Sequence, residues 1–97
     1  MATYIVLGNF TEQGIRSVKE TTKRAEGFKA LAKQHGVTVK DIYWTLGSFD
    51  IVSILEAPDE AAVTALGLIL GSAGNVRTQT MRAFSADDMG KILARVK

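Results

Sequence analysis

Apolar and polar positions change their spacing along the chain, so that short strand-like runs alternate with longer helical ones. Residues 3–9, TYIVLGN, are rich in β-branched and aromatic residues and predict a strand. Over residues 11–34, apolar positions recur every three or four residues, which predicts one long helix. Thr11 can cap its start, and His35-Gly36 can end it. Its expected inward stripe is Ile15, Val18, Thr22, Ala25, Phe28 and Ala32.

Two further apolar runs follow almost without interruption. Strands are expected at about residues 37–46 and 49–56, separated only by Gly47 and Ser48. A two-residue connection that begins with glycine favours a type II′ hairpin, because its first position needs a positive φ. Gly47 and Ser48 are therefore expected to form a structural turn.

The last part of the chain predicts a helix, a strand and a final short helix. Asp59, after Pro58, can cap the first of these helices, and residues 71–74 break it. Its expected buried stripe is Ala62, Val63, Leu66, Ile69 and Leu70. A strand is expected at residues 75–84, and Ser85 with Asp88 resembles a capping box. The apolar face of the final helix is Met89, Ile92, Leu93 and Val96.

The order β-α-β-β-α-β predicts an α+β, ferredoxin-like fold: a four-stranded antiparallel sheet covered by two helices, plus a C-terminal helix. Ninety-seven residues suit a single domain, 1–97. Both faces of the strands are apolar; the first strand places Tyr4 and Val6 on one side and Ile5 and Leu7 on the other. Two helices can cover only one face, so we expect a homo-oligomer that pairs through the other.

Composition narrows the class of protein. The chain is 46% apolar, with one proline, no cysteine and no apolar run near the roughly 18 residues of a membrane span. We therefore expect a cytoplasmic protein with no membrane contact and no disulfide. One histidine and no clustered carboxylates predict neither a metal site nor a cofactor. A net charge of +2 does not indicate nucleic acid, and LGSFDIVSI lacks the stacking aromatics of RNA-recognition motifs.

Asp50 is the most unusual polar residue, because it stands at the mouth of an apolar strand. The more economical interpretation is that its carboxylate accepts N–H groups of the Gly47-Ser48 turn. Alternatively it lies at the rim of a cavity, where it could bind an ammonium group or polarise a water molecule. Trp44 and Phe49 are the aromatic candidates for such a ligand site.

Polar residues in the last strand are the other candidates for binding. Arg77 or Arg82, with Asn75 nearby, could hold an anionic ligand, since arginine pairs with carboxylates and phosphates. Pairing within an oligomer, with Asp50 or with Glu56, is the simpler interpretation. The single histidine, His35, is an acid–base candidate, but its place at a helix end favours a surface role.

The stretches TLGSFDIVSILEAPDEAAV and GNVRTQTMRAFS resemble the GYD domain, a family of small bacterial and archaeal proteins. The resemblance runs from Tyr4 to the final helix. Phe49 stands where the family name has tyrosine, so a phenolic hydroxyl is missing there. The family is similar to dimeric α/β-barrel proteins, in which two sheets face each other, which implies such a dimer here.

The resemblance implies a fold more than an activity. The chain also resembles the amino-acid-sensing part of feast/famine transcription regulators, without their helix-turn-helix segment. Two functions stay open: a sensor or accessory protein that binds a small, anionic or amino-acid-like ligand between facing sheets, and a cofactor-free oxygenase or isomerase that uses the same cavity. Whether the chain is an enzyme is therefore left open by the sequence.

Overall fold

Four strands form one antiparallel sheet in the computed structural model, which describes residues 1–97. The strands are β1 (Ala2–Phe10), β2 (Thr38–Trp44), β3 (Ile51–Ala57) and β4 (Val76–Ala83). Their order across the sheet is β2-β3-β1-β4, and every neighbouring pair is antiparallel. This confirms the ferredoxin-like fold expected from the sequence. Within one chain the sheet is open and does not close into a barrel.

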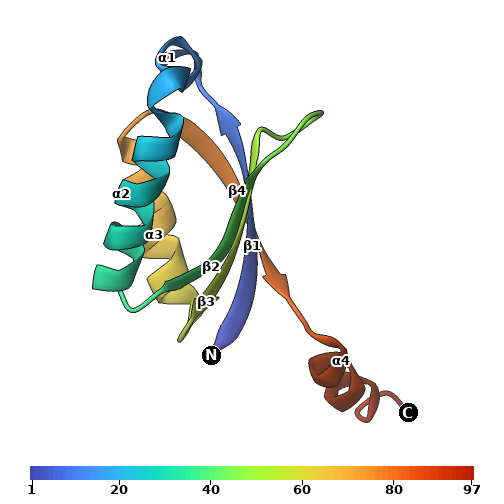
Figure 1. Ribbon diagram of the computed structural model, residues 1–97. Helices are drawn as coiled ribbons and strands as arrows, with labels where there is room; N and C mark the ends of the chain where they lie inside the picture. Colours follow the sequence, from blue (N-terminus) through green and yellow to red (C-terminus); the bar gives the residue numbers. More distant parts are fainter.

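Helices cover one face of this sheet. They are α1 (Glu12–Arg16), the 3₁₀ turn η1 (Val18–Glu20), α2 (Thr21–Gln34) and α3 (Glu60–Ser72). Figure 1 shows α2 and α3 side by side over the same face, with α1 at one end. The last helix, α4 (Ala86–Leu93), projects beyond the sheet and away from this layer (Figure 1). The opposite face of the sheet has no helix on it.

The single long helix expected over residues 11–34 is wrong, because the chain bends at Ser17. Thr11 does cap the start, with its hydroxyl accepting the Gly14 N–H at 3.0 Å. The Arg24 guanidinium donates to the Ser17 carbonyl at 2.9 Å and so holds the bend in place. As a result Ile15 is 52% exposed and leaves the inward stripe, which begins only in α2.

The ends of the other helices follow their capping residues, as predicted. Gly36 has φ +74° and closes α2. The Asp59 carboxylate accepts the Ala62 N–H at 2.9 Å and starts α3. Ser85 and Asp88 form a capping box at α4. Hydrogen bonds from the Ser85 backbone and hydroxyl lower the pKa of Asp88 from its ordinary value.

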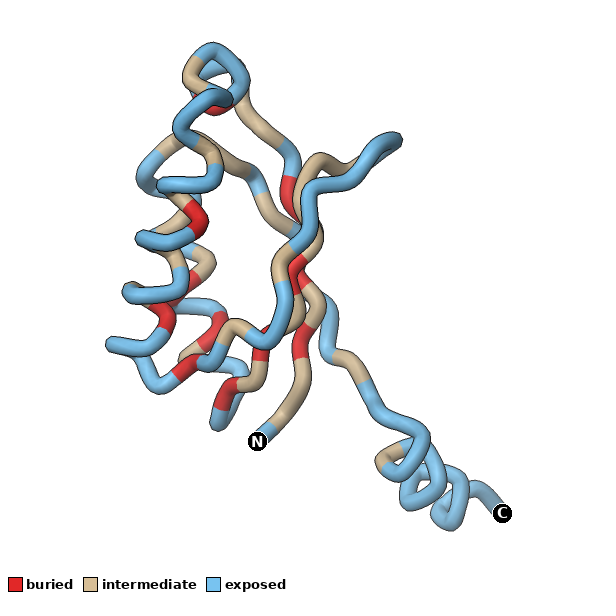
Figure 2. The backbone as a smooth tube through the Cα atoms, viewed as in Figure 1, coloured by how far each residue is buried: buried red, intermediate tan, exposed pale blue.

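The hydrophobic core lies between the sheet and the helical layer. Figure 2 shows the buried segments there, while α4 is almost wholly exposed. The core residues are Tyr4, Val6, Ala32, Val37, Leu55, Ala57, Val63 and Leu66. Ile69 was expected among them but is 39% exposed, because α3 is apolar on nearly every side and only Val63 and Leu66 are buried.

The connection between β2 and β3 is longer than the two-residue hairpin expected. Six residues, 45–50, separate the strands, and the Thr45 hydroxyl closes the loop on the Phe49 carbonyl at 2.6 Å. Gly47 does adopt the positive φ, +102°, that the sequence predicted. Just before β3, Asp50 donates its backbone N–H to the Gly8 carbonyl at 2.9 Å, and its own carbonyl accepts the Thr45 N–H at 2.8 Å.

Candidate functional site

Asp50 links two strands and does not hold the turn. Its carboxylate accepts the backbone N–H of Phe10 at 2.9 Å, and Phe10 ends β1. The same residue bonds Gly8 through its N–H and Thr45 through its carbonyl. The expected contacts with N–H groups of the 47–48 turn are therefore wrong. The carboxylate satisfies a donor at the end of the neighbouring strand, 40 positions away in the sequence.

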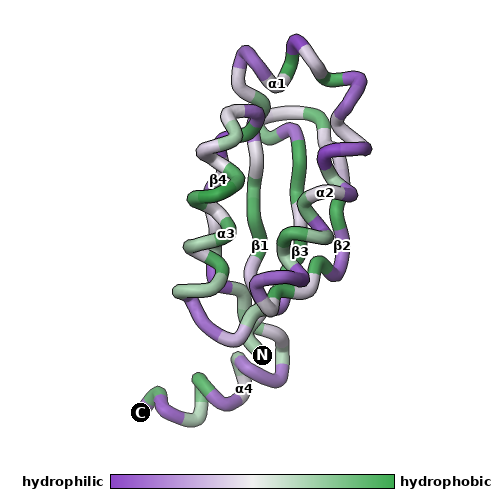
Figure 3. Tube along the Cα trace, turned by 90° about the vertical axis from the view of Figure 1, so that its left-hand side faces the viewer, coloured by the Kyte–Doolittle hydropathy of each residue, from purple (hydrophilic) through white to green (hydrophobic).

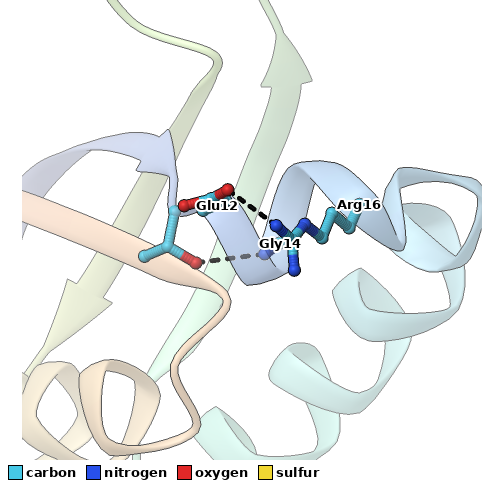
Figure 4. A network of polar contacts seen from close by, with 4 residues as sticks. Glu12, Gly14 and Arg16 are labelled. Atoms are coloured by element: carbon cyan, nitrogen blue, oxygen red, sulfur yellow. Dashed lines mark hydrogen bonds and ion pairs between the residues drawn. The ribbon is translucent and has the colours of Figure 1, made fainter.

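Asn75 belongs to a tight corner between β1 and the α3–β4 loop. Its carbonyl accepts the Thr11 N–H at 3.1 Å, and its side-chain oxygen accepts from Gln13 at 3.0 Å. A Cβ on Gly14 would lie 1.9 Å from that same carbonyl, so only glycine fits at this position. Figure 4 shows the start of α1, where the Gly14 N–H is capped and Glu12 meets Arg16. The carbonyl and the side-chain oxygen of Asn75 are thus engaged within the chain.

Trp44 lies on the helix side of the sheet. Its indole N–H donates to the Thr21 hydroxyl at 2.9 Å, and the ring borders a small cavity of about 60 Å³ between α2 and the sheet. The walls are largely apolar, and Arg24 and Ser53 are among their few polar residues. The sequence alone does not indicate this position of Arg24, because an arginine in a basic helix has no distinguishing signal.

The two arginines of β4 lie at opposite ends of the strand and differ in their contacts. Arg82 stacks on Phe84 at 4.5 Å and donates to the Thr3 carbonyl at 3.3 Å. Arg77 pairs with Asn9 in the strand register, is exposed, and has no ion pair within the chain. The ion pair of Glu56 is with Lys40, at 3.7 Å. Arg77 is therefore the arginine left free to meet something else.

The sequence-predicted site residues are not brought together. Trp44 faces the helices, and Phe49 sits half-buried in the loop before β3. Asp50 and Arg77 lie at the same end of the sheet, on either side of β1, while Arg82 is at the far end. His35 is exposed at the C-terminal cap of α2, as expected for a surface residue. No group of three or more His, Cys, Asp or Glu is placed to hold a metal ion.

The side of the sheet that no helix covers carries apolar residues with no layer packed against them. Register and strand alternation place a set of apolar side chains there, which we call the open face: Ile5, Leu7, Tyr43, Val52, Ile54 and Met81. Tyr43 and Met81, on the two outer strands, are 55% and 44% exposed. Large exposed apolar patches mark interaction sites. The prediction of a sheet that is apolar on both faces is confirmed.

Polar residues gather at one end of the open face. Asn9 on β1 lies opposite Arg77 on β4, and the next residue of β4 on that side, Gln79, lies opposite Leu7. These three side chains can donate several hydrogen bonds and carry one positive charge. This end could therefore receive a small anionic group.

A second apolar surface lies on the outer side of α3. Leu68 is 70% exposed there, and Ile69 beside it is 39% exposed. It borders a groove between α3 and β4, whose walls also include Thr64, Gly71 and Arg77. β4 forms the edge of the sheet, so its outer backbone groups have no partner strand. The unusually apolar sequence of α3 was the signal that could have revealed this surface.

None of the helices is both long enough and apolar enough to cross a membrane.

The chain exposes 6580 Å² of surface, whereas a compact monomer of its mass exposes roughly 5,400 Å². Its radius of gyration, 14.6 Å, also exceeds the roughly 12.5 Å expected for this length. The excess reflects the thin, one-sided body and the projecting α4.

Comparison with known proteins gives two matches. The model of the GYD domain family matches residues 4–93, which is most of the chain. A protein of Thermus thermophilus, described as a glutamine synthetase and cystathionine beta-lyase binding protein, is 37% identical over 98 aligned residues. The alignment covers all of both chains.

Proposed function

This chain belongs to the GYD domain family, and from that premise we propose that it is an oligomeric accessory protein that binds metabolic enzymes. The observation that carries the proposal is the full-length similarity to a relative named for binding two enzymes. The apolar residues of the open face support it, and the chain as a whole exposes more surface than a compact monomer of its mass.

In this proposal the two apolar surfaces have separate tasks. The open face pairs with the open face of a second copy, because a sheet that is apolar on both sides needs a second cover. The outer side of α3 then stays available, with Leu68 as an anchor beside the groove.

Binding to purified glutamine synthetase and cystathionine beta-lyase from the same organism tests the proposal. We expect the chain to co-elute with at least one of the two enzymes in size-exclusion chromatography. The substitution Leu68→Asp should weaken that binding about tenfold or more, because it places a charge in the contact. Ala30→Asp, on an exposed part of α2, adds the same charge and serves as the control. Failure to bind either enzyme would overturn the proposed function.

A small ligand between facing sheets is a second candidate function. Asn9, Arg77 and Gln79 favour it, since they gather at one end of the otherwise apolar open face. An amino acid could place its carboxylate on the guanidinium of Arg77. Titration calorimetry with a panel of amino acids should then give a ligand whose affinity falls in Arg77→Gln. No heat with any amino acid at millimolar concentration would exclude this ligand class.

The cofactor-free enzyme is the alternative that the structure supports least. Such an enzyme needs a base within hydrogen-bond reach of its substrate. The carboxylate of Asp50 is held by the Phe10 N–H, and His35 is at the exposed end of α2.

A further inference from the structure

The helix α4 has a complete apolar side and nothing to pack against. Its apolar residues are Met89, Ile92, Leu93 and, just beyond it, Val96, with exposures of 40%, 36%, 59% and 69%. No residue of α4 is buried. Isolated helices shorter than about 12–15 residues are marginal in water. A separate eight-residue helix therefore needs a surface that stabilises it.

Its own chain does not supply that surface. Only Phe84 and Ser85 connect β4 to α4. The Phe84 ring is held by the guanidinium of Arg82, which also bonds the carbonyls of Thr3 and Ala83. Ser85 is extended, and its hydroxyl caps the first turn of α4. This short, fixed link directs α4 away from the sheet, and Figure 3 shows it as a separate tail below the body.

We propose that α4 is an exchanged arm, whose apolar side packs against the open face of a second copy of this chain, and reciprocally. This inference rests on the proposed self-association and adds the segment that secures it. The facing sheet would cover the centre of the open face, and the arm would cover its margin at Tyr43. That side chain is 55% exposed and lies on β2, the strand farthest across the sheet from the chain's own β4.

The amount of exposed surface favours a second copy of this chain as the partner that covers α4 and the open face. Stable interfaces bury roughly 800 Å² per partner. The excess of this chain over a compact monomer is of that order, roughly 1,200 Å². The open face and the α4 side contribute to the same excess, so one association between copies can cover both.

The charges of α4 argue against a membrane as the occupant. Helices that lie on membranes concentrate lysine and arginine on their polar side. In α4 the carboxylates of Asp87 and Asp88 balance Lys91 and the following Arg95. Such mixed charges are suited to another protein surface with both signs, and the open face is bordered by the Lys40–Glu56 ion pair.

A pair of matched charge substitutions tests the arm. Leu93→Asp places a carboxylate on the apolar side, and Ala94→Asp adds the same charge about 100° further round the helix. In sedimentation equilibrium, we expect Leu93→Asp to raise the dissociation constant about tenfold or more and Ala94→Asp to leave it near the parent value. Equal constants for the two variants would overturn the exchanged arm.

The same experiment separates this inference from the proposed function. Ile54→Asp alters the open face but not the arm. If Ile54→Asp dissociates the protein and Leu93→Asp does not, the copies pair through their sheets and the arm is not exchanged. Enzyme binding is tested separately with Leu68→Asp. Its result is therefore independent of the results for Ile54→Asp and Leu93→Asp.

Disulfide trapping adds a positional test, because the chain contains no cysteine. Leu93→Cys and Tyr43→Cys are made as separate proteins and mixed under mild oxidation. We expect a mixed disulfide dimer, since each cysteine comes from a different copy. Lys33→Cys, on the exposed side of α2, replaces Leu93→Cys in the control. A mixed dimer no more abundant than in this control would overturn the assigned contact.

Discussion

The two faces of the sheet carry similar apolar residues but have opposite surroundings. Leu55 and Ile54 are neighbours on β3 and point to opposite sides. Leu55 is 1% exposed beneath the helices, whereas Ile54 lies on the open face with no element above it. Both positions are equally hydrophobic in the sequence. The difference shows that hydrophobicity specifies which residues need cover, while the connections decide whether the same chain provides it.

The largest expected effect on stability distinguishes Leu55 from Ile54. Leu55→Ala should lower the free energy of unfolding by about 2–5 kcal/mol, because it leaves a cavity in the core. Ile54→Ala, studied at concentrations where copies are apart, should cost about 1 kcal/mol or less. Denaturant unfolding measures both. Equal losses at high dilution would mean that the open face is packed within the single chain.

Two glycines in the helical layer test how closely its contacts are packed. Gly14→Ala forces a methyl group against the Asn75 carbonyl and should cost about 1–3 kcal/mol. Gly27→Ala, within α2, has no atom within 4 Å of its new methyl group. It should stabilise the fold by about 0.5–1 kcal/mol. Thermal unfolding midpoints that move in the same direction would contradict the corner described around Asn75.

The β2–β3 loop offers a test at the end of the hairpin. Gly47 has φ +102°, which a β-branched residue adopts only with strain. Gly47→Val should therefore cost about 1–3 kcal/mol, while Ser48→Ala should change stability by about 0.5 kcal/mol or less. Matching denaturation midpoints for the two variants would show that the loop adopts another conformation.

The smallest expected effect concerns Asp50, where β3 begins. Asp50→Asn keeps one acceptor oxygen for the Phe10 N–H but loses the charge that strengthens the bond. The free energy of unfolding should fall by about 1 kcal/mol. Chemical denaturation at neutral pH measures the change. A variant more stable than the parent would favour a carboxylate that serves a ligand and not the fold.

Much of the fold could be predicted from local signals. Caps at Thr11, Asp59 and Ser85 and the left-handed Gly36 act over three or four residues, so the sequence reveals them directly. Apolar alternation along the strands likewise indicated two apolar faces. These features depend on neighbours in the sequence, and the family resemblance over residues 4–93 agrees with them.

The wrongly predicted features depend on contacts that reach beyond the three or four residues of a local signal. The bend at Ser17 needs Arg24, one turn into the next helix, and Asp50 finds its partner 40 positions away. Ile69 matches the helical period but lies outside the contact between α3 and the sheet. The chemistry of a side chain can mark it as a candidate site residue. It does not indicate which strand end or corner of the fold that residue occupies.

Sedimentation equilibrium of the unmodified protein tests the central claim, that the open face is an interface between copies. At micromolar concentration we expect a mass of at least two chains of 10.5 kDa, and a folded single chain for Ile54→Asp. A parent protein that stays at the mass of one chain at every concentration would contradict the claim.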